Sequence, residues 1–147
     1  MRYLRTIQDI LDYAIEQETE ANQFYTDLAQ KVQKDELRTA LKNFAIDEFQ
    51  HKLRLEGVKE GQIELTPEEI GTLHLAETIE EVKPWPNMSY KDLLALAIKK
   101  EAKAEQLYQK LAQLSKRKHV QELFTLLAQE EAQHKLNLEI EYDLTIF

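Results

Sequence analysis

Apolar residues recur at spacings of three and four along the N-terminal third of the chain, a pattern that predicts two amphipathic helices. The first follows Thr6 and Asp9, which resemble a capping box with Asp in place of Glu. Its apolar stripe comprises Ile7, Ile10, Leu11, Ala14, Ile15, Ala21, Tyr25, Leu28 and Val32. The second begins near Asp35, and Gly57 and Gly61 mark the region where it ends. Its stripe comprises Leu37, Leu41, Phe44, Leu55 and Val58, with a gap in the middle.

The C-terminal third shows the same arrangement. Ser89 and Asp92 predict a capped helix start, and the stripe that follows comprises Leu93, Leu94, Ala97, Ile98, Ala104, Tyr108 and Leu111. The final helix shows Val120, Phe124, Leu127 and Leu138, again with a gap. Between the two pairs, Thr66 and Pro67 favour the start of a short helix that runs to about Val82, before Pro84 and Pro86. A connection of this length can cross a whole helical bundle.

The two pairs of helices are copies of one unit. A shift of 83 positions gives 18 identities over 46 gapless positions, where average residue usage would give about 3. We therefore expect an all-α, single-domain protein over residues 1–147, a four-helix bundle built from two duplicated helical hairpins with a long crossover. Repeat 1 covers about 6–59, the crossover about 60–88 and repeat 2 about 89–142.

Glutamate and histidine fill the gaps in the four apolar stripes. They occur in the same positions of both repeats: Glu18, Glu48 and His51, then Glu101, Glu131 and His134. Residues three apart share one face of a helix, so each Glu-x-x-His pair directs two side chains to one place. Four buried carboxylates are prohibitive unless positive charge is present, and two divalent ions would balance them. Carboxylate and imidazole ligands suit iron or manganese.

Several of these residues also have alternative interpretations. A lone Glu-x-x-His is a weak signal, and a duplicated bundle that has lost its metal would keep a buried salt-bridge network. His74 and His119 lack a Glu partner at this spacing, so we read both as ordinary local or surface residues. Four further residues could form hydrogen bonds to the metal ligands: Tyr25, Tyr108, Asp47 and Glu130. For the two tyrosines the alternative is packing in the core. For the two acids it is an exposed acidic face.

The composition and net charge of the chain exclude several classes of function. The chain has 147 residues and a net charge of −8, which argues against a nucleic-acid partner. It has no Cys, so disulfides, iron–sulfur clusters and Cys₄ iron centres are excluded within it. The N-terminus leads into polar sequence rather than a signal peptide, and no apolar run approaches the roughly 20 residues of a membrane span. We expect a soluble, cytoplasmic protein without a membrane partner.

The chain resembles the rubrerythrin branch of the ferritin-like superfamily. The resemblance is carried by AIEQE at 14–18, FY at 24–25 and DEFQH at 47–51, and by their counterparts AIKKE at 97–101, LY at 107–108 and EEAQH at 130–134. It implies a left-handed crossover bundle with a non-haem di-iron centre, in which manganese or a mixed metal pair is an alternative. It further implies that Glu48 and Glu131 bridge the irons, that Glu18 and Glu101 are terminal ligands, and that the two histidines each ligate one iron.

The chain departs from the rubrerythrin pattern in two places, and one further residue argues against a bacterioferritin. Rubrerythrins proper carry a C-terminal rubredoxin domain and an extra Glu one turn after the third-helix ligand, where this chain has Ala104, with Glu105 one residue out of register. The haem-ligating Met of bacterioferritins corresponds to Phe49. The resemblance therefore implies reduction of hydrogen peroxide or dioxygen with an external electron donor such as rubredoxin. The alternatives are ferrous iron oxidation or handling, and a bundle that metal only stabilises. A homodimer is compatible with the resemblance.

Overall fold

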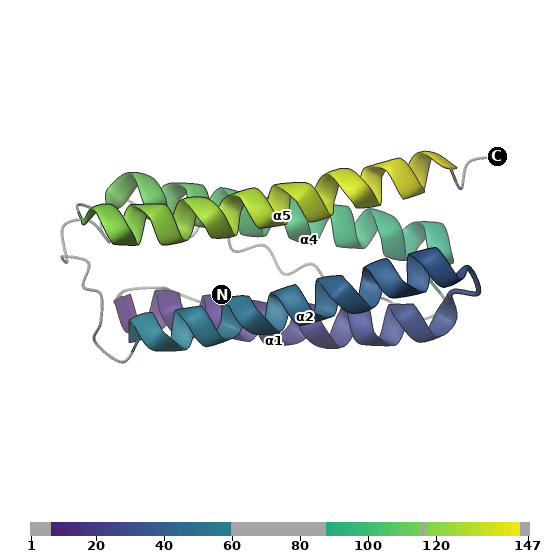
Figure 1. Cartoon of the computed structure of the whole chain (residues 1–147), viewed down its shortest axis with the longest axis horizontal. Coiled ribbons are helices and arrows are strands. Elements are labelled where there is room, and N and C mark those ends of the chain that lie inside the picture. The colour runs from purple at the N-terminus through teal and green to yellow at the C-terminus, as the bar shows by residue number, and fades with distance from the viewer. Residues whose placement is uncertain (1–6, 60–87, 116, 145–147) are drawn as a thin grey trace. The chain divides into compact units, whose positions relative to one another are not determined.

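The computed structural model describes residues 7–59, 88–115 and 117–144, and these residues are almost entirely helical. The four helices are α1 (Ile7–Lys31), α2 (Asp35–Gly57), α4 (Tyr90–Leu114) and α5 (Lys118–Leu144). Helices α1 and α2 pack together as one hairpin, and α4 and α5 pack together as another (Figure 1). The chain divides between them into two compact units, which are described separately below. The prediction of an all-α protein is confirmed.

The turn of the N-terminal hairpin is three residues long, because α1 ends at Lys31 and α2 begins at Asp35. Arg38 stabilises this turn by donating to the carbonyl of Val32 at 2.9 Å and by pairing with Asp35 at 3.3 Å. Further along, the Asn22 amide donates to the carbonyl of Ala45 at 2.7 Å and joins α1 to α2. The apolar residues that line the interior are those of the predicted stripes, among them Ile10, Leu11, Ala14, Leu28, Leu41, Phe44 and Leu55.

The C-terminal hairpin begins with the predicted capping box. The Ser89 hydroxyl accepts from the backbone N–H of Asp92 at 3.1 Å, and the Asp92 carboxylate accepts from the backbone N–H of Ser89 at 3.2 Å. These two bonds satisfy donors that the first helical turn leaves unpaired. The hairpin core again follows the predicted stripes and includes Leu94, Ala97, Leu111, Val120, Phe124, Leu127 and Leu138.

The helix boundaries follow the 83-residue shift seen in the sequence. Helix α4 begins and ends 83 positions after α1, and α5 begins 83 positions after α2. After Gly57 the α-helix gives way to a π-helical turn at residues 58–59, whereas α5 carries Ile140 at the position that matches Gly57 and continues as an α-helix to Leu144.

Some predictions lie outside the described residues. They are the Thr6 cap, the region of Gly61, the short helix from Thr66 to Val82, the residues Pro84 and Pro86, and His74. Within the ranges that the structure covers, none of the helices combines the length and the apolar character that a membrane crossing requires.

Candidate metal centre

Each hairpin gathers one Glu from its first helix with a Glu and a His from its second. In the N-terminal hairpin, one ligand atom each from Glu18, Glu48 and His51 lies within 4.8 Å of the other two. The His51 Nδ1 atom lies 3.5 Å from Oε2 of Glu18 and 3.5 Å from Oε1 of Glu48. We call these three residues the N-terminal half-site.

The C-terminal hairpin repeats this geometry. One ligand atom each from Glu101, Glu131 and His134 lies within 4.8 Å of the other two, and these residues form the C-terminal half-site. The His134 Nδ1 atom lies 3.7 Å from Oε1 of Glu101 and 3.8 Å from Oε1 of Glu131. The structure therefore brings together the three sequence-predicted residues within each repeat.

All six side chains are buried, with at most 3% of any residue exposed. They are buried because they occupy positions in the apolar stripes, where the same helix faces that bury leucine and phenylalanine carry them inward. Each half-site places two carboxylates beside one imidazole, so even a protonated histidine leaves excess negative charge. Buried charge of this kind is costly without a positive partner, which is the electrostatic condition of a cation site.

The distances within each half-site fit ligands around a shared ion. A direct charged hydrogen bond between imidazole and carboxylate is about 2.7–2.9 Å long, shorter than the 3.5–3.8 Å distances from Nδ1 to the carboxylates. Donor atoms bound at about 2.1 Å to one ion lie roughly 3–4 Å from one another. With oxygen and imidazole donors, each half-site fits a first-row transition metal such as iron or manganese.

Two buried tyrosines lie seven positions after the first-helix glutamates. The Tyr25 ring meets Phe44 edge-on at a centroid distance of 5.5 Å, and the Tyr108 ring stacks on Phe124 at 6.4 Å. Both rings therefore pack in the core of their hairpins. The hydrogen bonds from the tyrosine hydroxyls to the ligating carboxylates remain a prediction. The same holds for Asp47 and Glu130, which are half-buried and are expected to accept hydrogen bonds from the ligating histidines.

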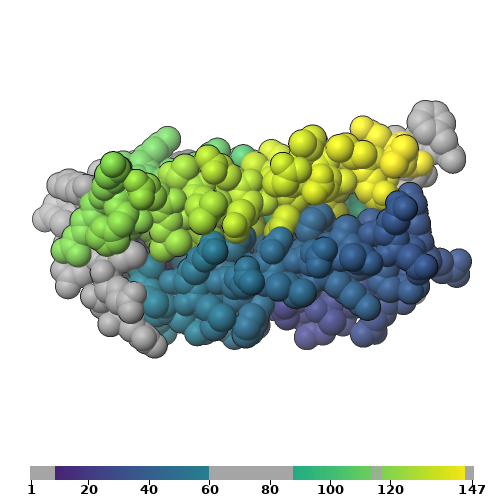
Figure 2. Space-filling model, viewed as in Figure 1, coloured from purple at the N-terminus to yellow at the C-terminus, as the bar shows by residue number. Residues whose placement is uncertain are grey.

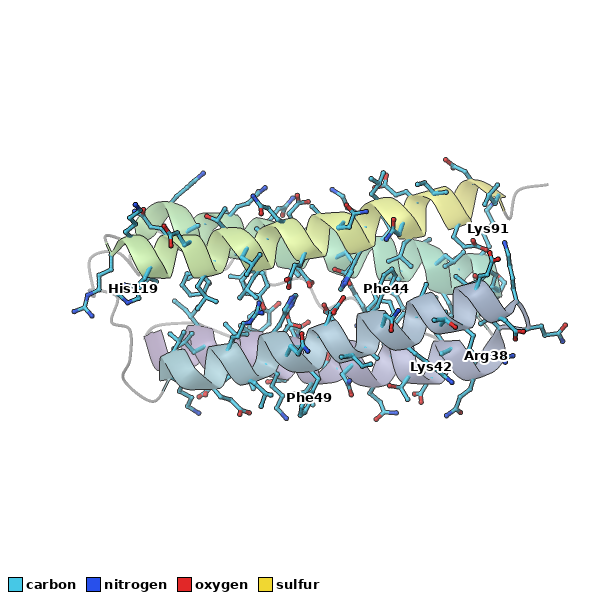
Figure 3. All side chains as sticks on the ribbon, in the orientation of Figure 1. Arg38, Lys42, Phe44, Phe49, Lys91 and His119 are labelled. Atoms are coloured by element: carbon cyan, nitrogen blue, oxygen red, sulfur yellow. The ribbon has the colours of Figure 1, made fainter. Side chains whose placement is uncertain are left out.

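One histidine is remote from the half-sites. His119 is exposed at the start of α5 and projects away from its hairpin, in line with its assignment as a surface residue (Figure 3).

The sequence reasoning missed a contact beside the C-terminal half-site. Lys135, the residue after His134, donates from Nζ to Oε1 of Glu105 at 2.9 Å. This hydrogen bond is the first cause of a raised Lys135 pKa, with the charges of Glu105 and Glu139 adding to it against partial desolvation. The signal in the sequence was a mismatch between the repeats, because position 105 corresponds to Asn22 in repeat 1.

Comparison with known proteins gives one match. A family model described as Rubrerythrin matches residues 4–87 and 92–143, which is nearly the whole chain and includes all six residues of the two half-sites. No curated protein and no solved structure matches the chain significantly.

Proposed function

The chain belongs to the rubrerythrin family of ferritin-like, di-iron carboxylate four-helix bundles, and we propose that it reduces hydrogen peroxide, or dioxygen, with electrons from a separate donor protein such as rubredoxin. The observation that carries this proposal is the pair of matching half-sites, each with two buried carboxylates and one buried imidazole. Each half-site would hold one ion of the pair, because four carboxylates balance the charge of two divalent ions.

The residues of the half-sites have defined tasks in this proposal. The ion pair, when bound, supplies the two electrons that the reduction of peroxide requires. Glu18 and Glu101 hold the ions from the first helix of each hairpin, and the two Glu-x-x-His pairs hold them from the second. His51 and His134 would bind an ion through Nδ1, the ring nitrogen that faces the carboxylates of each half-site, and this nitrogen would have to be deprotonated to do so. All six residues are buried, which would keep bulk water away from bound ions.

A second candidate function is ferrous iron oxidation or iron handling. The observation that favours it is the absence of a carboxylate at position 104. Rubrerythrins have an extra Glu at this position, whereas this chain has Ala104. The neighbouring Glu105 does not substitute for it, since its carboxylate is already paired with Lys135 at 2.9 Å. A peroxidase cycle that needs that extra carboxylate would be slow in this chain, whereas oxidation of iron would not require it.

Anaerobic reconstitution followed by peroxide titration tests these proposals. Ferrous iron is added to the metal-free chain, bound metal is measured by elemental analysis, and peroxide is added with and without reduced rubredoxin. Peroxidase function predicts about two irons per chain and rapid oxidation of rubredoxin that depends on peroxide. Iron handling predicts that many irons are oxidised per chain.

A variant with both Glu48 and Glu131 changed to Ala serves as the control and should show neither metal binding nor turnover. Absence of stoichiometric transition metal in the reconstituted wild-type chain would overturn the proposal. A fully loaded chain with a higher melting temperature but no redox turnover would assign the metal a purely structural role.

A further inference from the structure

Helix α4 differs from the other helices in the sign of its charge. It carries five lysines and three acids, whereas α1, its counterpart in the N-terminal hairpin, carries six acids and one lysine. Acids also outnumber lysine and arginine on α2 and on α5. Among the described helices, α4 is therefore the only one with a net positive charge, in a chain whose net charge is −8. Figure 2 shows the C-terminal hairpin from the side of α5, drawn in green to yellow, with most of α4 behind it.

Three of the α4 lysines form one stripe on the side of the helix opposite to Glu101. Lys99 and Lys103 lie two residues before and two residues after this buried glutamate, and Lys110 lies seven residues after Lys103. Residues at spacings of four and seven share one face of a helix, whereas a residue two positions away lies on the other side. Lys99 is exposed, and Lys103 and Lys110 are half-buried. We call these three lysines the α4 stripe.

The matching stripe on α1 has the opposite charge. At the three equivalent positions the first repeat has acids, all of them exposed: Glu16, Glu20 and Asp27. Each stripe lies on the outer side of a helix that carries one half-site glutamate on its inner side. The two half-sites therefore have the same ligands but are backed by helices of opposite charge.

We propose that the α4 stripe is the docking surface for an acidic electron-donor protein, so that electrons enter beside the C-terminal half-site. This inference rests on the proposed reduction of peroxide with electrons from a separate donor. Weak redox complexes bury little surface and use complementary charge to steer the partners together. A chain of net charge −8 repels an acidic protein as a whole, so a local positive face selects where that protein approaches. Steering acts through the summed charge of the helix rather than through any single lysine.

The position of the stripe is suited to electron transfer. A donor that docks on it is separated from the inner face of α4, which carries Glu101, by about 10 Å, the diameter of a helix. For a donor that carries one electron, two dockings supply the two electrons that, with two protons, convert one hydrogen peroxide to two waters. The acidic stripe on α1 repels the same donor, so electrons enter at one half-site rather than at both.

Binding of a zinc-substituted rubredoxin of net negative charge tests the docking separately from turnover, because this probe cannot transfer electrons. In a nuclear magnetic resonance titration of the full chain, amide signals along α4 should shift more than those along α1. The shifts should disappear at about 1 M salt, where the screening length is about 3 Å. Lys99→Glu combined with Lys103→Glu should weaken binding by at least about tenfold. Lys99→Arg combined with Lys103→Arg keeps both charges and should bind as the wild type does.

The control for net charge is Lys31→Glu combined with Lys42→Glu. This double variant reverses the same number of charges at exposed positions of α1 and α2. It should retain most of the binding, because the α4 stripe is intact. Circular dichroism verifies that each variant is folded.

Three results would overturn the docking proposal. They are a wild-type chain that does not bind the probe, shifts that centre outside α4, and an equal loss of binding in the two Lys→Glu double variants. With iron bound, peroxide-dependent oxidation of reduced rubredoxin at low donor concentration should slow by the same factor as binding weakens in the Lys99→Glu, Lys103→Glu variant. Binding on α4 without any such oxidation by the wild-type chain would support the docking and overturn the peroxidase function instead.

Discussion

Lys135 donates a hydrogen bond to Glu105 across the C-terminal hairpin, with 2.9 Å between Nζ and Oε1. The contact joins α5 to α4 one residue beyond His134 and about one turn beyond Glu101. At the matching position of the N-terminal hairpin, Asn22 donates instead to the carbonyl of Ala45 at 2.7 Å. The two hairpins are therefore joined beside equivalent half-sites by different chemistry, an ion pair in one and a neutral amide in the other.

Replacing Glu105 by Gln should reduce stability in a pH-dependent way. At neutral pH we expect the metal-free variant to lose about 0.5–1 kcal/mol of unfolding free energy, the value of a partly exposed ion pair. Glu105 raises the pKa of Lys135, so the contribution is fully present below the ordinary value of 10.5 and is lost as the pH rises through the raised value. Urea denaturation between neutral and strongly alkaline pH measures the difference. Asn22→Ala is the matched control, whose cost should not follow this titration.

Replacing Glu101 by Gln should stabilise the metal-free chain and weaken metal binding. The buried carboxylates of a half-site repel one another without a cation, so removal of one charge should raise the unfolding free energy by about 1–3 kcal/mol. With iron present the order should reverse, because binding stabilises the wild-type chain more. Thermal melts with and without iron measure both effects, and Glu122→Gln at an exposed position is the control. A less stable metal-free variant would instead support a salt-bridge network in which the carboxylates pair with charged histidine.

Phe in place of Tyr108 or Tyr25 separates the packing role of these rings from the role of their hydroxyls. Both rings are buried against a phenylalanine, and the substitution keeps that contact. If the hydroxyls bond to ligating carboxylates, each variant should bind metal about tenfold more weakly with little change in the metal-free melting temperature. Competition with a metal-binding dye measures the affinity. Unchanged metal affinity would assign both tyrosines to packing alone.

Two serine-to-alanine changes near the ends of α4 should have opposite consequences. Ser89→Ala removes the bond that the Ser89 hydroxyl accepts from the Asp92 backbone N–H, and should cost about 1 kcal/mol of unfolding free energy. Ser115 is buried, and its Oγ atom has no hydrogen-bond partner among the described residues, so Ser115→Ala should be neutral or stabilising. Denaturation curves of the two variants provide the comparison. Equal losses would contradict the view that the cap, rather than serine itself, stabilises this helix.

Local signals explain why much of the fold could be predicted. The cap at Ser89 depends on residues a few positions apart, and it is found as expected. The half-site residues were recognisable because charge in an apolar stripe is costly and therefore conspicuous. Each set of three also lies within one hairpin, so a single helix–helix contact is enough to bring it together.

Features that depend on the rotation of one helix against another could not be predicted. The bond between Lys135 and Glu105 spans 30 residues, and either side chain on its own reads as a solvated charge. The exposure of Ile46 and Phe49 on α2 could not be predicted either, because both lie beside ligand and core positions in the sequence. Only the packed hairpin shows which apolar residues face inward and which face outward.

Each half-site draws its two Glu and its His from one hairpin, and this has a consequence for which substitutions the chain can accept. Substitutions in one repeat can alter its surface without disturbing the ligands of the other, so the two copies are free to diverge wherever they face outward. Glu16, Glu20 and Asp27 of α1 correspond to Lys99, Lys103 and Lys110 of α4, whereas the inward Glu and His are the same in both hairpins.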